Sequence, residues 1–348
     1  MINHIEPYYG KAEQRAMAKY LKSGGFMTEH KVTEEFEEML AKFLEVPYVS
    51  CVPNGTSAIY LSLLASGIGK GDKVLVPDLT MIATANAVKM TGAEPVLVDI
   101  DSFNFCLDVR SIKSEAKAMI YVDLNGRSGN TREVKSYCKK HNMVLIEDAC
   151  QALGSKYKGK YLGTFGRFGC FSLGFHKIIT TGQGGFIVTH TKKDYEAIER
   201  LKDFGRVKGG NDIHDYLGFN FKFTDLQAVI GIEQLKTIEW RMKKKRQLYK
   251  WYFDEEADEG YVPWFIEYVG FDRDEIYEHL MNKKIGCRKM YPPIHSQKIY
   301  ESGDFPNAEN ISEMVLWLPS SLSLTKKQVD LIRREYEVIE GYERQVVV

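Results

Sequence analysis

Several features that mark common classes of protein are missing from this sequence. Its 348 residues carry 47 basic and 47 acidic side chains. The formal net charge is therefore zero, which gives no electrostatic reason to expect nucleic acid or an anionic membrane surface as a partner. No apolar run reaches about 18 residues, and the N-terminus lacks a signal-peptide profile. We therefore predict a cytoplasmic protein with no membrane and no nucleic-acid partner.

Cysteine is also scarce. The six cysteines form neither a CxxC pair nor any spacing typical of a metal site. We therefore expect no bound metal and a reduced setting, in which cysteines such as Cys150 and Cys170 act as small core residues.

What is present is a regular alternation of strand-like and helix-like segments. Most strand-like runs are continuously apolar, as expected for strands covered on both faces. This pattern predicts an α/β lobe with a mainly parallel sheet, in which ligands gather at the carboxyl ends of the strands. The expected strands are 47–52, 73–77, 95–100, 118–124, 143–149, 169–173 and 185–189, and the expected helices are 57–66, 82–90, 131–140 and 193–201.

The pattern changes near residue 235. A long polar helix is expected over 225–253, and a mixed region follows it. That region contains a strand at 264–269, a helix at 272–283, a loop at 290–295 and a last helix at 326–342. We therefore predict a large α/β domain over 1–235 and a smaller α+β domain over 236–348.

Two polar segments follow expected strands. Asn54-Gly55-Thr56-Ser57 opens a helix, where free N–H groups and hydroxyls suit a phosphate, although these residues also suit a plain N-cap. Asp148 ends an apolar strand, where a carboxylate needs a cationic or N–H partner. It could equally cap the next segment.

Lys177 is the most unusual of the polar residues. It lies among aromatic and aliphatic side chains, five residues after Ser172 and just before a Gly-rich turn, 182–185. Burial would lower the pKa of its amine and make it a better nucleophile. The alternative is a lysine that reaches solvent, but the polar, Gly-rich turn favours a ligand site.

A fourth segment, 218–225, carries an amide among aromatic residues at Asn220. It could be no more than a hydrophobic staple followed by an N-cap at Thr224 or Asp225. Together, however, a phosphate cradle, a carboxylate and a lysine are the inventory that pyridoxal 5′-phosphate requires.

These residues lie in segments that resemble the DegT/DnrJ/EryC1/StrS family of sugar aminotransferases, and in particular its perosamine-synthase-like branch. The resemblance covers about residues 5–340. It implies the aspartate-aminotransferase (type I) fold, with a mostly parallel, mixed seven-stranded sheet. The segments that carry it are NGTSAIYLSLLASGIGKGDKVLVPD, TMIATANAVKMTGAEPVLVDID, IEDACQALGSKYKGKYLGTFG, GCFSLGFHKIITTGQGG and GFNFKFTDLQAVIG.

The resemblance implies a role for each matching residue. Lys177 would hold the cofactor through a Schiff base and shuttle the proton, Asp148 would pair with the pyridine nitrogen, and Gln151 would contact the ring hydroxyl. The residues that would hold the phosphate are Gly55, Thr56, Ser57 and Ser172, joined by Asn220 from the neighbouring subunit of a homodimer.

Other positions concern the substrate or depart from the family pattern. His295, Asp123 and Arg127 match places that approach the substrate, although the segment 122–127 differs from the common pattern. Met81 stands where an aromatic residue usually stacks on the cofactor. Gln183 replaces a usual glutamate, and 254–264 is shorter than is typical.

The implied reaction is ping-pong transamination through the pyridoxamine phosphate form of the cofactor. Glutamate would donate the amino group, and a nucleotide-linked 4-keto-6-deoxyhexose would accept it, forming an amino sugar for polysaccharide synthesis. The alternatives are a C3 aminotransferase or a dehydratase acting on a related keto sugar. Relatives that are dehydratases carry histidine in place of Lys177, which favours the transaminase.

Overall fold

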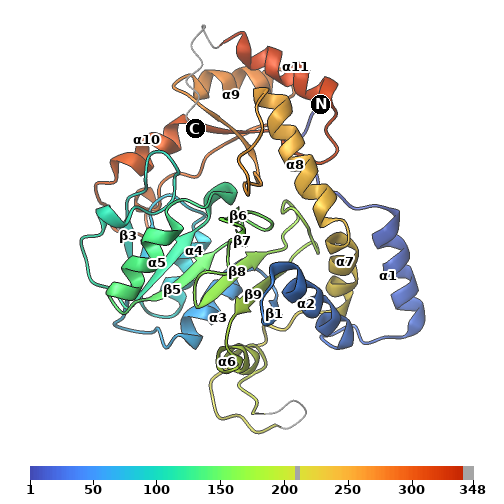
Figure 1. Cartoon of the computed structure of the whole chain (residues 1–348), viewed down its shortest axis with the longest axis vertical. Coiled ribbons are helices and arrows are strands. Elements are labelled where there is room, and N and C mark those ends of the chain that lie inside the picture. Colours follow the sequence, from blue (N-terminus) through green and yellow to red (C-terminus); the bar gives the residue numbers. More distant parts are fainter. Residues whose placement is uncertain (208–211, 340–348) are drawn as a thin grey trace.

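The computed structural model describes residues 1–207 and 212–339, which form a large lobe below a smaller one in Figure 1. The large lobe is built on a seven-stranded sheet in the order β1-β9-β8-β5-β4-β2-β3. The strands are β1 (Tyr48–Val52), β2 (Lys73–Pro77), β3 (Glu94–Val98), β4 (Ala118–Val122), β5 (Val144–Asp148), β8 (Phe168–Ser172) and β9 (Gly185–Thr189).

Four of the strand pairings are parallel, and the two pairings of β9, with β1 and β8, are antiparallel. The expected α/β lobe with a mostly parallel, mixed seven-stranded sheet is therefore confirmed. All seven expected strands are present, and their ends differ from expectation by two residues at most.

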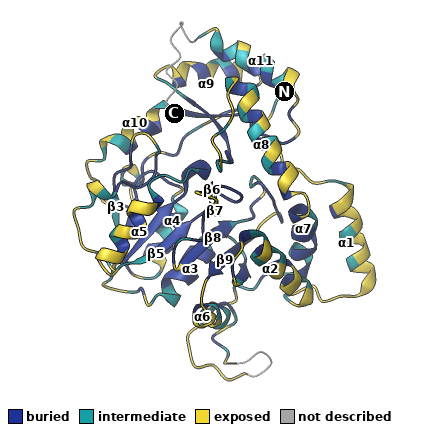
Figure 2. Cartoon of the chain, viewed as in Figure 1, coloured by how far each residue is buried: buried dark blue, intermediate teal, exposed yellow. Residues whose placement is uncertain are grey.

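Helices cover both faces of this sheet, so its strands are mostly buried (Figure 2), apart from the edge strand β3, in which only Val98 is buried. Four of the helices match expected ones, namely α3 (Gly55–Ala65), α4 (Ala83–Met90), α5 (Thr131–Lys140) and α6 (Lys192–Lys202). The structure adds α1 (Lys11–Ser23), α2 (Lys31–Leu44) and a short hairpin, β6 (Lys156–Tyr157) and β7 (Lys160–Tyr161), which the sequence pattern did not reveal.

The expected helix over 225–253 is wrong as a single element. It is two helices, α7 (Asp225–Leu235) and α8 (Ile238–Phe253), separated at Thr237, whose φ and ψ are −108° and 10°. The Thr237 hydroxyl donates to the Gln234 carbonyl at 2.9 Å and accepts from Arg241 at 2.9 Å. These local bonds compete with the helical pattern and stabilise the break.

The small lobe has a three-stranded sheet in the order β10-β12-β11, surrounded by helices. Its elements are β10 (Ile266–Val269), α9 (Arg273–Asn282), β11 (Arg288–Lys289), α10 (Pro306–Met314), β12 (Val315–Leu318) and α11 (Lys326–Glu337). The expected strand at 264–269 therefore begins two residues later. The expected end of the last helix, at 342, falls outside the described residues.

The two lobes exchange contacts near the N-terminus. Ile2 N–H donates to the Lys284 carbonyl at 3.0 Å, and Ser320 N–H donates to the His4 carbonyl at 2.9 Å. We propose the domain boundary at 235/236, beside the break between α7 and α8, with the first residues of the chain crossing to the small lobe.

Two features that would indicate other kinds of function are absent from the described residues. Over 1–207 and 212–339, no helix combines the length and apolar character needed to cross a membrane. In the same ranges, no group of three or more His, Cys, Asp or Glu side chains is arranged to hold a metal ion.

Candidate active site

Lys177 lies in the loop that joins β8 to β9. The two ends of this loop are tied together, because Leu173 N–H donates to the Gly184 carbonyl at 2.8 Å and Thr181 N–H donates to the Leu173 carbonyl at 3.1 Å. Within the loop, Lys177 N–H donates to the Gly174 carbonyl at 3.0 Å. These bonds fix the backbone that presents Lys177 at the carboxyl end of β8.

The Lys177 ammonium group faces the indole of Trp264, with 3.6 Å between Nζ and the ring centroid. The indole N–H of Trp264 donates to the His176 carbonyl at 2.9 Å, which holds the ring in place. Burial lowers the pKa of Lys177 from 10.5 to about 8, and the nearby Cys150 and Asp148 offset this only in part. A larger share of this amine is therefore neutral near pH 7 than of a surface lysine.

A small cavity of about 10 Å³ adjoins the Lys177 side chain. Its walls include Gln151, Ser172 and Lys177, three of the residues expected from the sequence to form the site, together with Cys150 and Trp264. The structure therefore brings together the ends of β5 and β8, and Trp264 of the small lobe covers them.

Asp148 ends β5 and is almost fully buried. Its carboxylate accepts the Thr84 hydroxyl at 2.7 Å and the Cys150 backbone N–H at 3.2 Å. These donors offset the cost of burying the carboxylate, as the sequence pattern required. Thr84 is not among the site residues expected from the sequence, and its hydroxyl also lies 3.3 Å from the hydroxyl of Thr80, which precedes α4.

The start of α3 confirms the N-cap that the segment 54–57 suggested. Asn54 is an N-cap, since its side chain accepts Ser57 N–H at 2.9 Å, and the Ser57 hydroxyl bonds back to Asn54. A side chain at Gly55 would overlap Cys150 Sγ at 2.6 Å and crowd Ser172 Cβ at 3.2 Å. The start of α3 thus sits directly against Ser172 at the end of β8.

A hydrogen bond from the backbone of Asn125 holds the Gln151 side chain. Its Oε1 accepts Asn125 N–H at 2.8 Å, and the Asn125 side chain in turn bonds the backbone of Phe265 through both its oxygen and its nitrogen. This chain of bonds ties the cavity wall at Gln151 to the small-lobe segment that carries Trp264.

Asp123 directly follows β4, where its N–H donates to the Asp148 carbonyl at 3.1 Å, and it is fully buried. Within the described residues, neither of its carboxylate oxygens has a hydrogen-bond partner. Burial raises the pKa of Asp123 well above its usual value, and the neighbouring Glu147 and Asp148 carboxylates raise it further. Both effects favour the protonated, neutral form of the Asp123 carboxyl.

Arg127 lies at the edge of a larger cavity, of about 730 Å³, between the two lobes. Its guanidinium pairs with Glu267 and lies 4.6 Å from the centroid of the Phe105 ring. This cavity shares no lining residue with the one beside Lys177. Its charged lining is mainly acidic, with Arg127 and Lys156 against Glu255, Glu256, Asp258, Glu259, Glu267, Asp272 and Glu337.

His295 joins the small lobe to the end of β2. Its Nδ1 lies 2.6 Å from Asp78, its Nε2 lies 3.2 Å from Glu309, and its backbone N–H donates to Asp78 at 2.9 Å. Both ring nitrogens therefore face carboxylates of the same chain.

Met81 and Asn220 are exposed, and neither lines the cavity at Lys177. Met81, which is 44% exposed, precedes α4, the helix that carries Thr84. Asn220 lies in the segment between α6 and α7, where it forms an isolated bridge with Asp203.

Residues 7–335 match the DegT/DnrJ/EryC1/StrS aminotransferase family. The chain belongs to this family. It is therefore an aminotransferase that uses pyridoxal 5′-phosphate.

Relatives of the chain carry more specific names. The GDP-perosamine synthase of Escherichia coli O157:H7 is 34% identical over 343 residues, which cover 93% of this chain and 94% of that protein. The GDP-perosamine synthase of Vibrio cholerae is 31% identical, with 94% and 96% covered. A crystal structure of a DegT/DnrJ/EryC1/StrS aminotransferase from Brucella abortus matches with a TM-score of 0.88 and 26% identity, covering 95% of each chain.

The residues around Lys177 fit this cofactor. A buried amine of lowered pKa suits an aldehyde, a buried carboxylate held by Thr84 suits a pyridine nitrogen, and the crowded glycine at the start of α3 leaves N–H groups for a phosphate. Thr84 and Trp264 are the contributions that sequence reasoning missed. No local signal marks Trp264, because it comes from the other lobe.

Proposed function

We propose that the chain transfers an amino group from glutamate to a nucleotide-linked 4-keto-6-deoxyhexose. The product would be an amino sugar of the perosamine or viosamine type, made in the cytoplasm by a homodimer with shared active sites. The observation that carries the proposal is the buried Lys177 amine, with a pKa of about 8, in one cavity with Gln151 and Ser172. The relatives named GDP-perosamine synthase support the sugar substrate.

When bound, pyridoxal phosphate supplies an electron sink for a carbanion next to nitrogen. In our proposal, Lys177 would hold the cofactor through its aldehyde, and the free Lys177 amine would carry a proton to and from the reacting carbon of the substrate. Asp148 would keep the pyridine nitrogen protonated, and the two donors to its carboxylate, the Thr84 hydroxyl and the Cys150 N–H, fix the direction of that carboxylate. Trp264 excludes water from the amine.

The remaining cofactor contacts follow from position. We propose that the N–H groups at the start of α3, with Gly55 and Thr56, hold the phosphate together with Ser172. The Ser57 hydroxyl already bonds Asn54, so Ser57 contributes mainly through the helix start. Other contacts that we propose are Gln151 to the ring hydroxyl, Met81 packed on the ring, and Asn220 reaching the phosphate of the neighbouring subunit.

The three candidate substrate residues are already enclosed or paired within the chain, which limits how they could contact the substrate. Asp123 is enclosed, and both ring nitrogens of His295 face carboxylates, so each would act by shaping the wall of the site. Arg127 faces a cavity whose acidic lining opposes a nucleotide diphosphate. We therefore place the diphosphate outside that cavity.

The test is turnover of a panel of nucleotide-linked 4-keto-6-deoxy sugars with glutamate, followed by mass spectrometry and NMR of the product. We expect a 4-amino sugar and equimolar 2-oxoglutarate. Lys177→Met is expected to lower turnover by about 10³-fold or more, since it removes both the covalent bond and the proton carrier. A 3-amino or 3-deoxy product would replace C4 transamination by the C3 aminotransferase or the dehydratase, and absence of turnover across the panel would contradict the proposal.

A further inference from the structure

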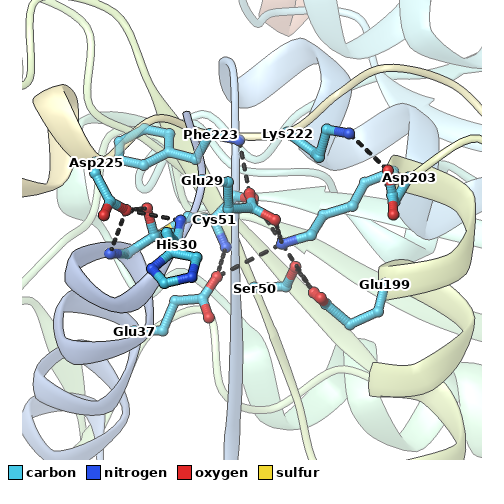
Figure 3. Close-up of polar contacts among 12 residues, drawn as sticks. Glu29, His30, Glu37, Ser50, Cys51, Glu199, Asp203, Lys222, Phe223 and Asp225 are labelled. Carbon is cyan, nitrogen blue, oxygen red and sulfur yellow. Dashed lines mark hydrogen bonds and ion pairs between the residues drawn. The ribbon is translucent and has the colours of Figure 1, made fainter. Parts of the chain in front are cut away.

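Lys202, the last residue of α6, is the centre of a buried ionic cluster remote from Lys177. Its side chain is 2% exposed, and its Nζ lies 2.9 Å from Glu199, 3.3 Å from Glu29 and 3.6 Å from Glu37. It also lies 3.4 Å from the Cys51 carbonyl of β1. In Figure 3 the three carboxylates converge on this one nitrogen from α2, the segment before it, and α6.

The backbone next to this lysine holds the segment that carries Asn220. Phe219 N–H donates to the Leu201 carbonyl at 2.7 Å, and Phe221 N–H donates to the Lys202 carbonyl at 2.9 Å. Asn220 is therefore flanked on both sides by residues bonded to the end of α6.

Glu29 links Lys202 to the other end of the segment that carries Asn220. One of its carboxylate oxygens faces Lys202, and the other accepts Phe223 N–H at 2.8 Å (Figure 3). The same carboxylate thus joins the buried ammonium to the backbone three residues after Asn220. Lys222 adds a 2.6 Å ion pair to Asp203.

The cluster holds its cation firmly. Although burial opposes the charge, Glu199, Glu37 and Glu29 raise the pKa of Lys202 well above its usual value. The ammonium therefore stays charged at every ordinary pH, and Lys202 is unsuited to proton transfer. Its chemistry is that of a fixed anchor.

The Asn220 side chain itself is left available. In the part of the chain that the structure describes, no group donates to it or accepts from it, and the residue is exposed. A fixed backbone that presents an unpartnered amide to the surface suits a contact with a second molecule.

We propose that Lys202 is a positioning residue for the cofactor phosphate of the neighbouring subunit. With Glu29 it fixes the segment 219–223, and Asn220 on that segment reaches across the subunit interface. This inference rests on the proposed homodimer with shared sites. It predicts that a substitution in the cluster weakens cofactor binding in the partner's site. Cofactor binding in the site of the substituted chain itself should not change.

The test uses hybrid dimers made by co-expressing two differently tagged chains. One chain carries Lys177→Met, so that only the other chain can form the visible absorption band with pyridoxal phosphate. Lys202→Met is then placed in either chain, and the dissociation constant of the cofactor is measured from that band. Glu29→Ala is tested in parallel, because it removes the Phe223 acceptor and keeps the buried lysine paired with two carboxylates.

With either variant in the Lys177→Met chain, we expect the dissociation constant to rise about tenfold, the scale of one hydrogen bond to a charged group. With the variant in the intact chain, we expect less than about a twofold change, because the partner then supplies an undisturbed Asn220. Lys192→Met, at the exposed start of α6, is the matched control. It is expected to leave the dissociation constant unchanged in both arrangements.

Asn220→Ala in the same two arrangements separates this inference from the proposed function. If Asn220→Ala raises the cofactor dissociation constant in the partner's site and neither cluster variant does, the anchoring role is wrong and the shared site stands. If Asn220→Ala has no effect, or if hybrids do not form, the shared site is wrong and the inference falls with it. Equal losses in both arrangements would show a general structural effect and would also overturn the inference.

Discussion

Lys177 and Lys202 are both buried lysines of the large lobe, but their surroundings shift the ammonium pKa in opposite directions. Lys177 faces an indole and hydrophobic walls, and burial lowers its pKa to about 8. Lys202 faces three carboxylates, which raise its pKa despite burial. The difference shows that the neighbours of a buried lysine, and not its burial alone, decide whether it serves chemistry or structure.

A third buried lysine sharpens this comparison. Burial lowers the pKa of Lys245 to about 7, and its Nζ donates to the carbonyls of Trp264 and Ser320 at 2.7 Å each. Lys245 lines neither of the two cavities described above. A lowered pKa therefore does not by itself mark a candidate catalytic amine, whereas at Lys177 the lowered pKa coincides with a cavity lined by Gln151 and Ser172.

The largest expected difference in stability comes from making the same exchange at both sites. Lys202→Met is expected to lower the free energy of unfolding by about 3–5 kcal/mol, because it leaves buried carboxylates without their cation. Lys177→Met in the cofactor-free protein is expected to raise it below pH 8. There the wild-type amine is protonated in both states, and folding pays the full cost of burying its charge.

The difference in the free energy of unfolding between Lys177→Met and the wild type should shrink as the pH rises from about 8 to 10.5. In this range the unfolded wild-type chain holds a proton that the folded chain has lost, so the wild type gains stability. Urea unfolding over this pH range measures both variants. Equal stability of Lys177→Met and Lys202→Met at pH 7 would contradict the comparison.

The next effect concerns the cover over Lys177. Trp264→Ala would admit water and raise the pKa of this amine from about 8 toward 10.5. Since only the neutral amine attacks the cofactor aldehyde, the pH midpoint for the rate of colour development should rise by about one unit. Trp240→Ala, which alters an exposed ring, is the control, and an unchanged midpoint in Trp264→Ala would show that the indole does not set the pKa.

The smallest expected effect concerns the charge balance around Lys202. Burial raises the pKa of Glu37 from 4.5 to about 8. The stability that this group contributes when protonated is full below pH 4.5 and is lost as the pH rises through about 8. Glu37→Gln cannot ionise, so its stability relative to the wild type should improve across that range. Glu38→Gln, on the exposed side of α2, should show no such trend, and parallel pH profiles for the two variants would refute the assignment.

Much of the fold was predictable because its signals are local. The continuous apolar runs at 73–77 and 185–189 are strands with those bounds. The helix over 225–253 was predicted as one element because its periodicity continues through Thr237, whose side-chain bonds break it. The hairpin strands β6 and β7 are two residues long, too short to leave a periodic pattern.

The residues of the candidate site also fall into two groups, those that the local sequence marks and those that only the tertiary structure brings to the site. Lys177, Asp148 and Ser172 could be selected from the residues around them, because each ends a strand or follows one in sequence. Trp264 could not, since it comes from the small lobe and meets Lys177 only after the lobes pack. Thr84 was equally hidden, because a threonine in a helix carries no mark of the carboxylate that it will bond.

The sequence by itself determined the strand–helix alternation, the family and the candidates for the reacting amine, the carboxylate and the phosphate-binding segment, because these depend on neighbours within a few residues. Only the tertiary structure decided which lysine is neutral enough to react and which is locked in its charged form. That choice depends on side chains such as Trp264 beside Lys177 and Glu29 beside Lys202. The energy of a buried charge is set by what surrounds it in space, and those neighbours are distant in the chain.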